Sequence, residues 1–225
     1  MQDNVYRRKR GMNKKTKLDL NKVKRLLEEA FSKNSERKLL SLIKNNSFLL
    51  YELYQRKYNI SPCFAEIPFG DYRCDFCWLN DNSDGPEWVL VEIEKPSLSL
   101  FKKNGDPTYY LTHAIEQVKS WKIFFERNPY EAKRIFGPIA RFRFVLVGGS
   151  KTDWNKPNAI QWRLEAKNNG IEIHSSDVFL RSLQVAKTNY TQLWSFEEYP
   201  LVKSKEDLKS FVLKSEYLLN MKQFF

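Results

Sequence analysis

The chain has 225 residues, of which 42% are hydrophobic and 15% aromatic, so it can bury a substantial core and does not have a disordered composition. No apolar run approaches the roughly 20 residues of a membrane-spanning helix, and the charged N-terminus lacks the apolar core of a signal peptide; we therefore expect a cytoplasmic protein with no membrane partner. The net charge of +11 favours a polyanionic partner, although a merely soluble basic surface is the alternative.

The N-terminal part combines a basic segment with helical patterns. Residues 1–17 are dense in Lys and Arg and lack apolar periodicity, which indicates a flexible basic arm that either binds phosphates or is simply solvated. In residues 18–35 apolar side chains recur at helical spacing, so we expect a helix followed by a short linker. A second helix should begin near Glu36, with a further helical stretch from Phe48 to Tyr54.

Three strands should follow. Cys63 to Phe69 is typical of a short strand, and Tyr72 to Phe76 begins a second one that leads into a polar turn. The chain resumes as a third strand from Trp88 to Lys95, so the pattern predicts a meander with a hairpin at its end. Symmetric pairing about the turn places Leu79 opposite Trp88.

Three carboxylates lie within the otherwise apolar strands of this hairpin. Counting back along both strands places Asp75 opposite Glu92, about 5 Å apart at Cβ, where like charges repel. Glu94 is two residues further on and points to the same face. Such acids need a compensating cation, a shared proton or open solvent, and a divalent metal is the most specific interpretation. The alternative is a solvated strand face whose acids pair with Arg73 or Lys95.

The cysteines give a weaker signal. Cys74 and Cys77 form a CxxC pair without a second half, and on a regular strand they point to opposite faces. Buried thiols are therefore expected, and a zinc site is the less favoured alternative.

The second half of the chain alternates strands and helices around a loop at Ser97 to Thr108. The patterns predict a helix from Tyr109 to Arg127, a strand from Arg141 to Val147, a helix from Pro157 to Asn168, a strand from Ile171 to Ile173, a helix capped by Ser176-Asp177 that runs to Ala186, and a terminal helix from Ser204 to Phe225 that starts with a capping box. A strand-helix-strand order favours parallel pairing through a crossover helix. The expected fold class is α/β, a mixed sheet flanked by helices.

Short motifs in this order resemble those of a known superfamily. They are Arg73-x-Asp75-Phe76, Val91-Glu92-Ile93-Glu94-Lys95-Pro96, Gly105-Asp106-Pro107 and His113-Ala114-Ile115-Glu116-Gln117-Val118-x-x-Trp121. Over roughly Glu36 to Ala186 the chain resembles the PD-(D/E)XK nuclease superfamily, and more narrowly the nuclease domain of Shedu antiphage defence proteins. The resemblance implies a restriction-endonuclease-like core with an N-terminal helical extension.

The resemblance also implies a division of the chain. Residues 1–17 are the basic arm, 18–35 the N-terminal helix and linker, 36–190 the PD-(D/E)XK-like nuclease domain and 191–225 a C-terminal helical segment. The resemblance further implies that such domains assemble, so we expect a homo-oligomer.

The resemblance assigns roles to the hairpin acids. In that superfamily an Asp on the second strand and an acid on the third bind magnesium, and here Asp75 and Glu92 fill these positions. Glu94 occupies the position of the superfamily's lysine, where it can contact the metal or act as a base for the attacking water. Lys95 is adjacent but points to the other face of a regular strand unless a bulge brings it round.

Other residues complete the expected site. Gln117 resembles the glutamine of the RecB-like nucleases, which holds a ligand or a substrate phosphate; an exposed surface amide is the alternative. Glu36 is the candidate for the first-helix acid of the metal shell, or else a surface residue at a helix start.

Residues around the acids are expected to contact nucleic acid. Arg73, Lys102 and Lys103 are candidates for binding the phosphate backbone. Tyr109, Tyr110 and His113 are candidates for lining the cleft, although Tyr110 also fits a core position.

The expected function is that of a DNA endonuclease dependent on Mg²⁺ or Mn²⁺, which hydrolyses phosphodiester bonds of double-stranded DNA in antiviral defence against phage. Hard oxygen ligands suit these ions, which neutralise clustered acids, activate water and stabilise charge on the phosphate. The alternative is a catalytically inactive nucleic-acid-binding or sensing module of the same fold. RNA as the substrate is a third interpretation.

Overall fold

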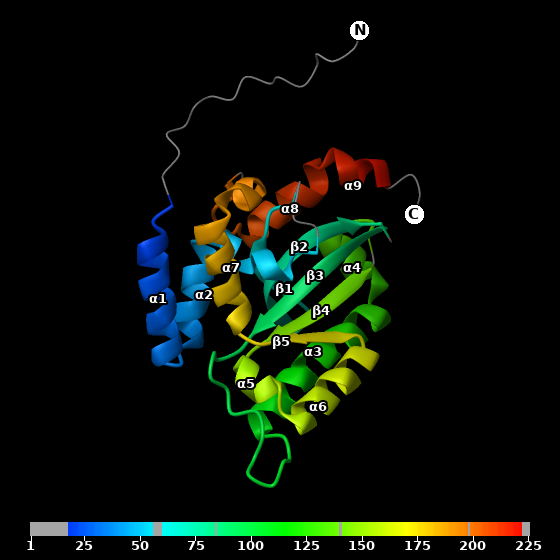
Figure 1. Ribbon diagram of the computed structural model, residues 1–225. Coiled ribbons are helices and arrows are strands. Elements are labelled where there is room, and N and C mark those ends of the chain that lie inside the picture. Colours follow the sequence, from blue (N-terminus) through cyan, green and yellow to red (C-terminus); the bar gives the residue numbers. More distant parts are fainter. Residues whose placement is uncertain (1–17, 56–59, 84, 140, 198, 222–225) are drawn as a thin grey trace.

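The computed structural model describes residues 18–55, 60–83, 85–139, 141–197 and 199–221, and the predicted basic arm at residues 1–17 lies outside them. A five-stranded mixed sheet in the order β1-β2-β3-β4-β5 forms its centre (Figure 1). The strands are β1 (Phe64–Phe69), β2 (Tyr72–Asn82), β3 (Gly85–Ile93), β4 (Phe142–Val147) and β5 (Ile171–His174). The first three pair antiparallel, and β3, β4 and β5 pair parallel. The predicted mixed α/β class is confirmed.

Helices cover both faces of the sheet, and each face has its own core. One core includes side chains from α3 (Tyr109–Arg127), α4 (Pro129–Phe136), α5 (Lys151–Trp154), α6 (Pro157–Asn168), α8 (Lys205–Lys214) and α9 (Glu216–Met221). The other includes side chains from α1 (Leu20–Ser32), α2 (Glu36–Lys44), the 3₁₀ helices η1 (Ser47–Leu53) and η2 (Tyr190–Glu197), and α7 (Asp177–Thr188). Among the described residues, no helix combines the length and the apolar character that crossing a membrane requires.

The hairpin has the predicted register but a shorter turn. Leu79 lies opposite Trp88, as expected. Both strands run further into the polar segment than predicted, to Asn82 on one side and Gly85 on the other. Asn80 tolerates this position because its buried amide donates hydrogen bonds to Gln55 (3.1 Å) and Glu87 (3.2 Å). A partnered amide can therefore occupy a strand that its residue type disfavours.

The helix predictions agree best with the structure where a helix has a long stripe of buried apolar side chains. α3 has the predicted bounds, and its apolar stripe is buried. After α3 ends, Pro129 is the first residue of α4, a short helix that the sequence patterns did not predict; proline favours this position because no amide donor is needed there. The terminal helix is two helices, since Ser215 is extended and separates α8 from α9; the capping box between Ser204 and Asp207 is present. Ser176 makes no side-chain cap at α7, contrary to expectation.

The C-terminal segment closes one edge of the sheet. The Ala65 N–H donates a hydrogen bond to the Lys203 carbonyl (2.9 Å), and the Lys203 N–H donates to the Cys63 carbonyl (2.8 Å). α8 follows directly and packs on β1. The edge strand β1 is thus paired and covered, which removes a site for unwanted strand addition.

The ends of β3 and β4 are in tight contact. The Glu94 N–H donates to the Val147 carbonyl (2.8 Å), and the Gly149 N–H donates to the Lys95 carbonyl (3.2 Å). A Cβ placed on Gly148 would lie 2.7 Å from the Cβ of Glu94. Only glycine fits at position 148 without displacing Glu94.

We therefore expect Gly148→Ala to lower the free energy of unfolding by about 1–3 kcal/mol, the usual cost of overpacking. For a chain of this size that is about 2–4 °C in melting temperature per kcal/mol. Thermal unfolding followed by circular dichroism measures it. Ser99→Ala, at an exposed position on the neighbouring loop, is the control and should be neutral; an unchanged melting temperature for Gly148→Ala would contradict the close packing.

Candidate active site

The predicted acids gather at the end of the sheet where β3 ends. The paired register of β2 and β3 ends at Phe76 opposite Val91, and Asp75 and Glu92 are the next residues along the two strands. Asp75 Oδ2 accepts a hydrogen bond from the Ile93 N–H (2.8 Å), so this carboxylate terminates the ladder between the strands. The expected juxtaposition of Asp75 and Glu92 agrees with this register.

Glu92 is held by the helix that covers the same face. Gln117 Nε2 of α3 donates a hydrogen bond to Glu92 Oε1 (2.6 Å). Glu92 Oε2 is buried and has no hydrogen-bond partner among the described residues. Burial, followed by the charges of Asp75 and Glu94, raises the pKa of Glu92 to about 10, while the bond from Gln117 opposes the shift. Gln117 is therefore part of the site rather than an exposed surface amide.

Asp75 lies in the same low-dielectric environment. Burial raises its pKa to about 7, the Ile93 N–H opposes the shift, and the charge of Glu36 raises it further. Glu36 is the first residue of α2, which packs on the opposite face of the sheet from α3. The helix brings its acid around the end of the sheet to the hairpin acids.

Glu94 completes this group. Its pKa is raised by burial and then by Glu36, and it is lowered by His113 and Lys95. We refer to Glu36, Asp75, Glu92 and Glu94 as the acid cluster. Glu36 raises the pKa of Asp75 and of Glu94, and Asp75 and Glu94 raise that of Glu92, because like charges that share a site disfavour ionisation.

A residue that the sequence analysis did not single out fixes the position of α2. Asn34 Oδ1 accepts a hydrogen bond from the Ser97 N–H (2.8 Å), and Asn34 Nδ2 donates to the Ser97 carbonyl (3.4 Å). Asn34 has φ 45°, in the left-handed region that asparagine tolerates better than most residues. The amide thus ties the turn before Glu36 to the loop after Glu94. The sequence signal that could have identified Asn34 is its position directly before Ser35, the residue that caps α2.

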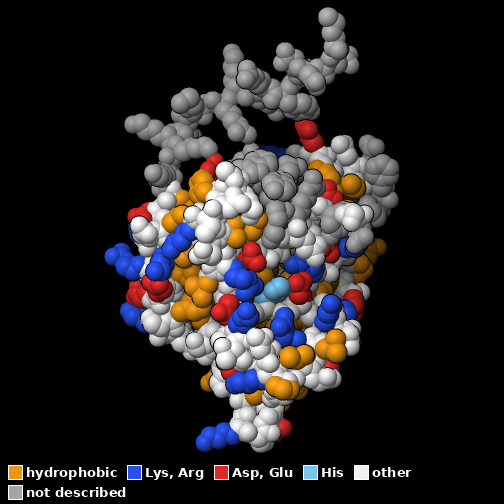
Figure 2. All heavy atoms as spheres, in the orientation of Figure 1, with side chains coloured by type: hydrophobic (Ala, Val, Ile, Leu, Met, Phe, Trp, Pro, Cys, Tyr) orange, Lys and Arg blue, Asp and Glu red, His pale blue; other side chains and the backbone are white. Residues whose placement is uncertain are grey.

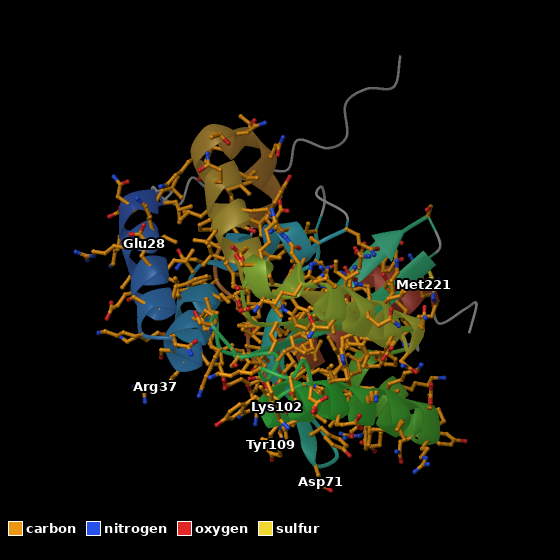
Figure 3. The ribbon with its side chains drawn as sticks, turned by 60° about the horizontal axis from the view of Figure 1, so that its bottom comes forward. Glu28, Arg37, Asp71, Lys102, Tyr109 and Met221 are labelled. Atoms are coloured by element: carbon orange, nitrogen blue, oxygen red, sulfur yellow. The ribbon has the colours of Figure 1, made fainter. Side chains whose placement is uncertain are left out.

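The structure places the predicted phosphate-binding residues on β2 and on the loop after β3. Lys95 follows the end of β3, so the expectation for a regular strand does not apply, and its Nζ lies 5.9 Å from the ring centre of Tyr110. Arg73 is exposed and forms an ion pair with Glu66 (3.8 Å). Lys102 and Lys103 are exposed on the loop between β3 and α3. Figure 3 shows Lys102 on the same side of the molecule as the start of α3.

A backbone irregularity accompanies the site. Glu66 lies between the pairs Ala65–Phe76 and Ile67–Cys74, hence opposite Asp75, and has φ 55°. A non-glycine residue in this region is strained, and such residues concentrate at functional sites. Its carboxylate faces Lys44 (3.2 Å) as well as Arg73.

The irregularity changes the expectation for the CxxC pair. Cys74 and Cys77 contribute to the same core, not to opposite faces. Regular alternation fails at Asp75 because the ladder is distorted there. All three cysteines are buried and free, so the prediction of buried thiols is confirmed.

The donor set of the acid cluster suits a hard divalent cation. Within the described ranges no group of three or more His, Cys, Asp or Glu side chains is arranged to hold a metal ion as it stands. Mg²⁺, however, is commonly held by one or two carboxylates, with water and substrate phosphate filling the other positions. The unpartnered Oε2 of Glu92 beside Asp75 fits that requirement.

The raised pKa values predict how stability depends on pH. The folded chain binds protons at Glu92 and Asp75 that the unfolded chain has released, so metal-free stability should fall as pH rises from about 4.5 towards the folded-state pKa values of about 7 and 10. Glu92→Gln removes the carboxylate that is costly to ionise in the folded chain. In metal-free buffer we therefore expect this variant to have a higher melting temperature than the natural chain, and the difference should grow between pH 6 and pH 8. Thermal unfolding at the two pH values measures it.

Glu131, a partly exposed residue of α4 whose pKa is lowered by Arg134, supplies the control. Glu131→Gln should not raise the melting temperature at either pH. A Glu92→Gln variant that melts lower than the natural chain at both pH values would contradict the picture of a strained, buried carboxylate.

Comparison with known proteins bears on the identity of this site. Residues 33–180 match the family model described as Shedu protein SduA, C-terminal. The match covers well over half of the chain and includes the four acids and Gln117. A search of curated proteins finds no match. The predicted resemblance to Shedu proteins is confirmed, and the chain belongs to the Shedu SduA C-terminal family.

Proposed function

We propose that this protein is a metal-dependent DNA endonuclease of the PD-(D/E)XK type that acts in antiphage defence. Membership of the Shedu family supports the defence role. The observation that carries the enzymatic part is the buried Oε2 of Glu92, which has no partner among the described residues. A buried carboxylate oxygen of this kind is costly unless a cation or a proton satisfies it.

The chain's own residues divide the work of hydrolysis. Asp75 and Glu92 would hold Mg²⁺ or Mn²⁺, which when bound supplies charge neutralisation and an acidified water. Gln117 orients Glu92 through Oε1, and the Ile93 N–H orients Asp75 through Oδ2, so each acid keeps its other oxygen directed away from these bonds.

Glu94 is the candidate base for the attacking water. Its pKa is raised by burial, and a general base works best when its pKa approaches the working pH. Gly148 fixes its main-chain position through close packing. This role accounts for a carboxylate at the position where related nucleases have lysine.

Charge favours a nucleic acid as the ligand. The chain has a net charge of +11, and the cations Arg73 and Lys95 act on acids of the cluster, Asp75 and Glu94 respectively. On the face that carries β5 and α6, acidic and basic side chains are interspersed (Figure 2), so the cations beside the acid cluster are better placed to hold a phosphate backbone. Binding should weaken steeply with salt.

A second function keeps the fold without the chemistry. Glu94 at the lysine position, and the absence of a ready three-ligand group among the described residues, favour a catalytically inactive nucleic-acid-binding or sensing module. A single assay of metal-dependent cleavage distinguishes the two functions.

Purified protein with Mg²⁺ or Mn²⁺ should cleave plasmid DNA, and Asp75→Ala or Glu92→Ala should abolish cleavage because each removes a ligand. Gln117→Ala should lower the rate by about 10- to 100-fold, as loss of a residue that orients a metal ligand does. Glu131→Ala, which removes a partly exposed acid of α4, is the control and should cleave normally. Retained DNA binding with no metal-dependent cleavage of DNA or of labelled RNA would establish the binding module instead.

Glu94→Gln should slow single-turnover cleavage by about 100-fold or more, the usual contribution of a general base, while DNA affinity stays the same. Glu94→Asp keeps a carboxylate and should recover part of the rate. A Glu94→Gln variant with the natural rate would remove Glu94 from the chemistry.

A further inference from the structure

Two consecutive tyrosines beside the acid cluster are exposed to solvent. Tyr109 is 72% exposed and Tyr110 is 59% exposed, although the sequence also fitted a core position for Tyr110. Their rings lie 6.0 Å apart in an edge-to-face arrangement. Large aromatic side chains bury easily, so two adjacent exposed rings are an unusual feature that indicates a ligand.

These rings contact residues that reach the acid cluster. The Tyr109 ring lies 5.7 Å from the His113 ring, and the charge of His113 acts on Glu94. Lys95, next to Glu94 in the chain, lies over the Tyr110 ring. Tyr109 and Tyr110, which we call the aromatic pair, are thus connected to Glu94 through His113 and through Lys95.

The position of the pair on α3 directs it towards that end. Helical side chains lean towards the helix N-terminus, and the pair occupies the first turn after the Thr108 cap. The rings therefore extend past the end of the helix. In Figure 3, Tyr109 lies on the side of the molecule where Lys102 and the start of α2 with Arg37 also appear.

We propose that Tyr109 and Tyr110 form a binding site for an unpaired nucleobase of the strand that is cut. Exposed rings stack on bases of any sequence, and neighbouring cations hold the backbone. Base pairs in an intact duplex present only their edges, so a stacking pair has a ligand only where a base is unpaired, as in a single-stranded segment or a flap. The inference rests on the proposed function and names its substrate class.

The test uses the full chain and a short oligonucleotide with 2-aminopurine, whose fluorescence falls when the base stacks. It is titrated with Ca²⁺ in place of Mg²⁺, as a single strand and as a blunt duplex of the same sequence. The natural protein should quench and bind the single strand more tightly. The double variant Tyr109→Ala, Tyr110→Ala should lose the quenching and bind the single strand about 10- to 100-fold more weakly, with a much smaller change for the duplex.

Two matched variants check the cause. Tyr109→Phe with Tyr110→Phe keeps both ring faces and should behave like the natural chain. Tyr130→Ala removes a tyrosine that is 88% exposed on α4, and it should have no effect. The proposal is overturned if Tyr130→Ala weakens quenching and single-strand binding as much as the double alanine variant does. It is also overturned if the double alanine variant still quenches the probe.

Other outcomes separate this inference from the nuclease proposal. A natural chain that quenches the probe but does not cut with Mg²⁺ supports the base site and contradicts the nuclease. A chain that cuts without quenching contradicts the base site alone. A double alanine variant that changes the sedimentation of the free protein, with unchanged DNA affinity, identifies a protein interface and overturns the proposal.

Discussion

One buried carboxylate, Glu92, sets the requirements for the rest of the site. Gln117 satisfies one of its oxygens, and the other is buried without a partner among the described residues. Low dielectric makes such a group costly to ionise, and the nearby charges of Asp75 and Glu94 increase that cost. The site therefore favours a proton or a cation, and catalysis by bound metal would convert this local instability into function.

The fold positions the acids with contacts of several kinds. A hydrogen bond from the Ile93 N–H holds Asp75 at the end of β3, and Asn34 attaches the start of α2 to the loop after β3. Gly148 allows β4 to approach Glu94. These contacts come from segments far apart in sequence. A site built this way depends on the whole sheet, whose edge strand β1 is paired with the C-terminal segment.

Sequence patterns predicted what local periodicity and symmetry control. The register at Leu79 and Trp88 followed from counting about a turn, and α3 followed from a long apolar stripe. The distortion at Glu66 did not, because a left-handed residue within a strand has no periodic signal, and it reversed the expected orientation of the CxxC pair. Asn34 was not singled out for a similar reason, since its partner Ser97 is 63 residues away.

The central claim is that Asp75 and Glu92 together hold a divalent metal. The most direct measurement is a crystal structure of the protein with Mn²⁺, in which anomalous scattering locates the ion. We expect a peak at coordinating distance from Asp75 and from Glu92 Oε2, with Gln117 still bonded to Oε1. An ion bound elsewhere, or no ion while Glu92 Oε2 stays unpartnered, would contradict the account.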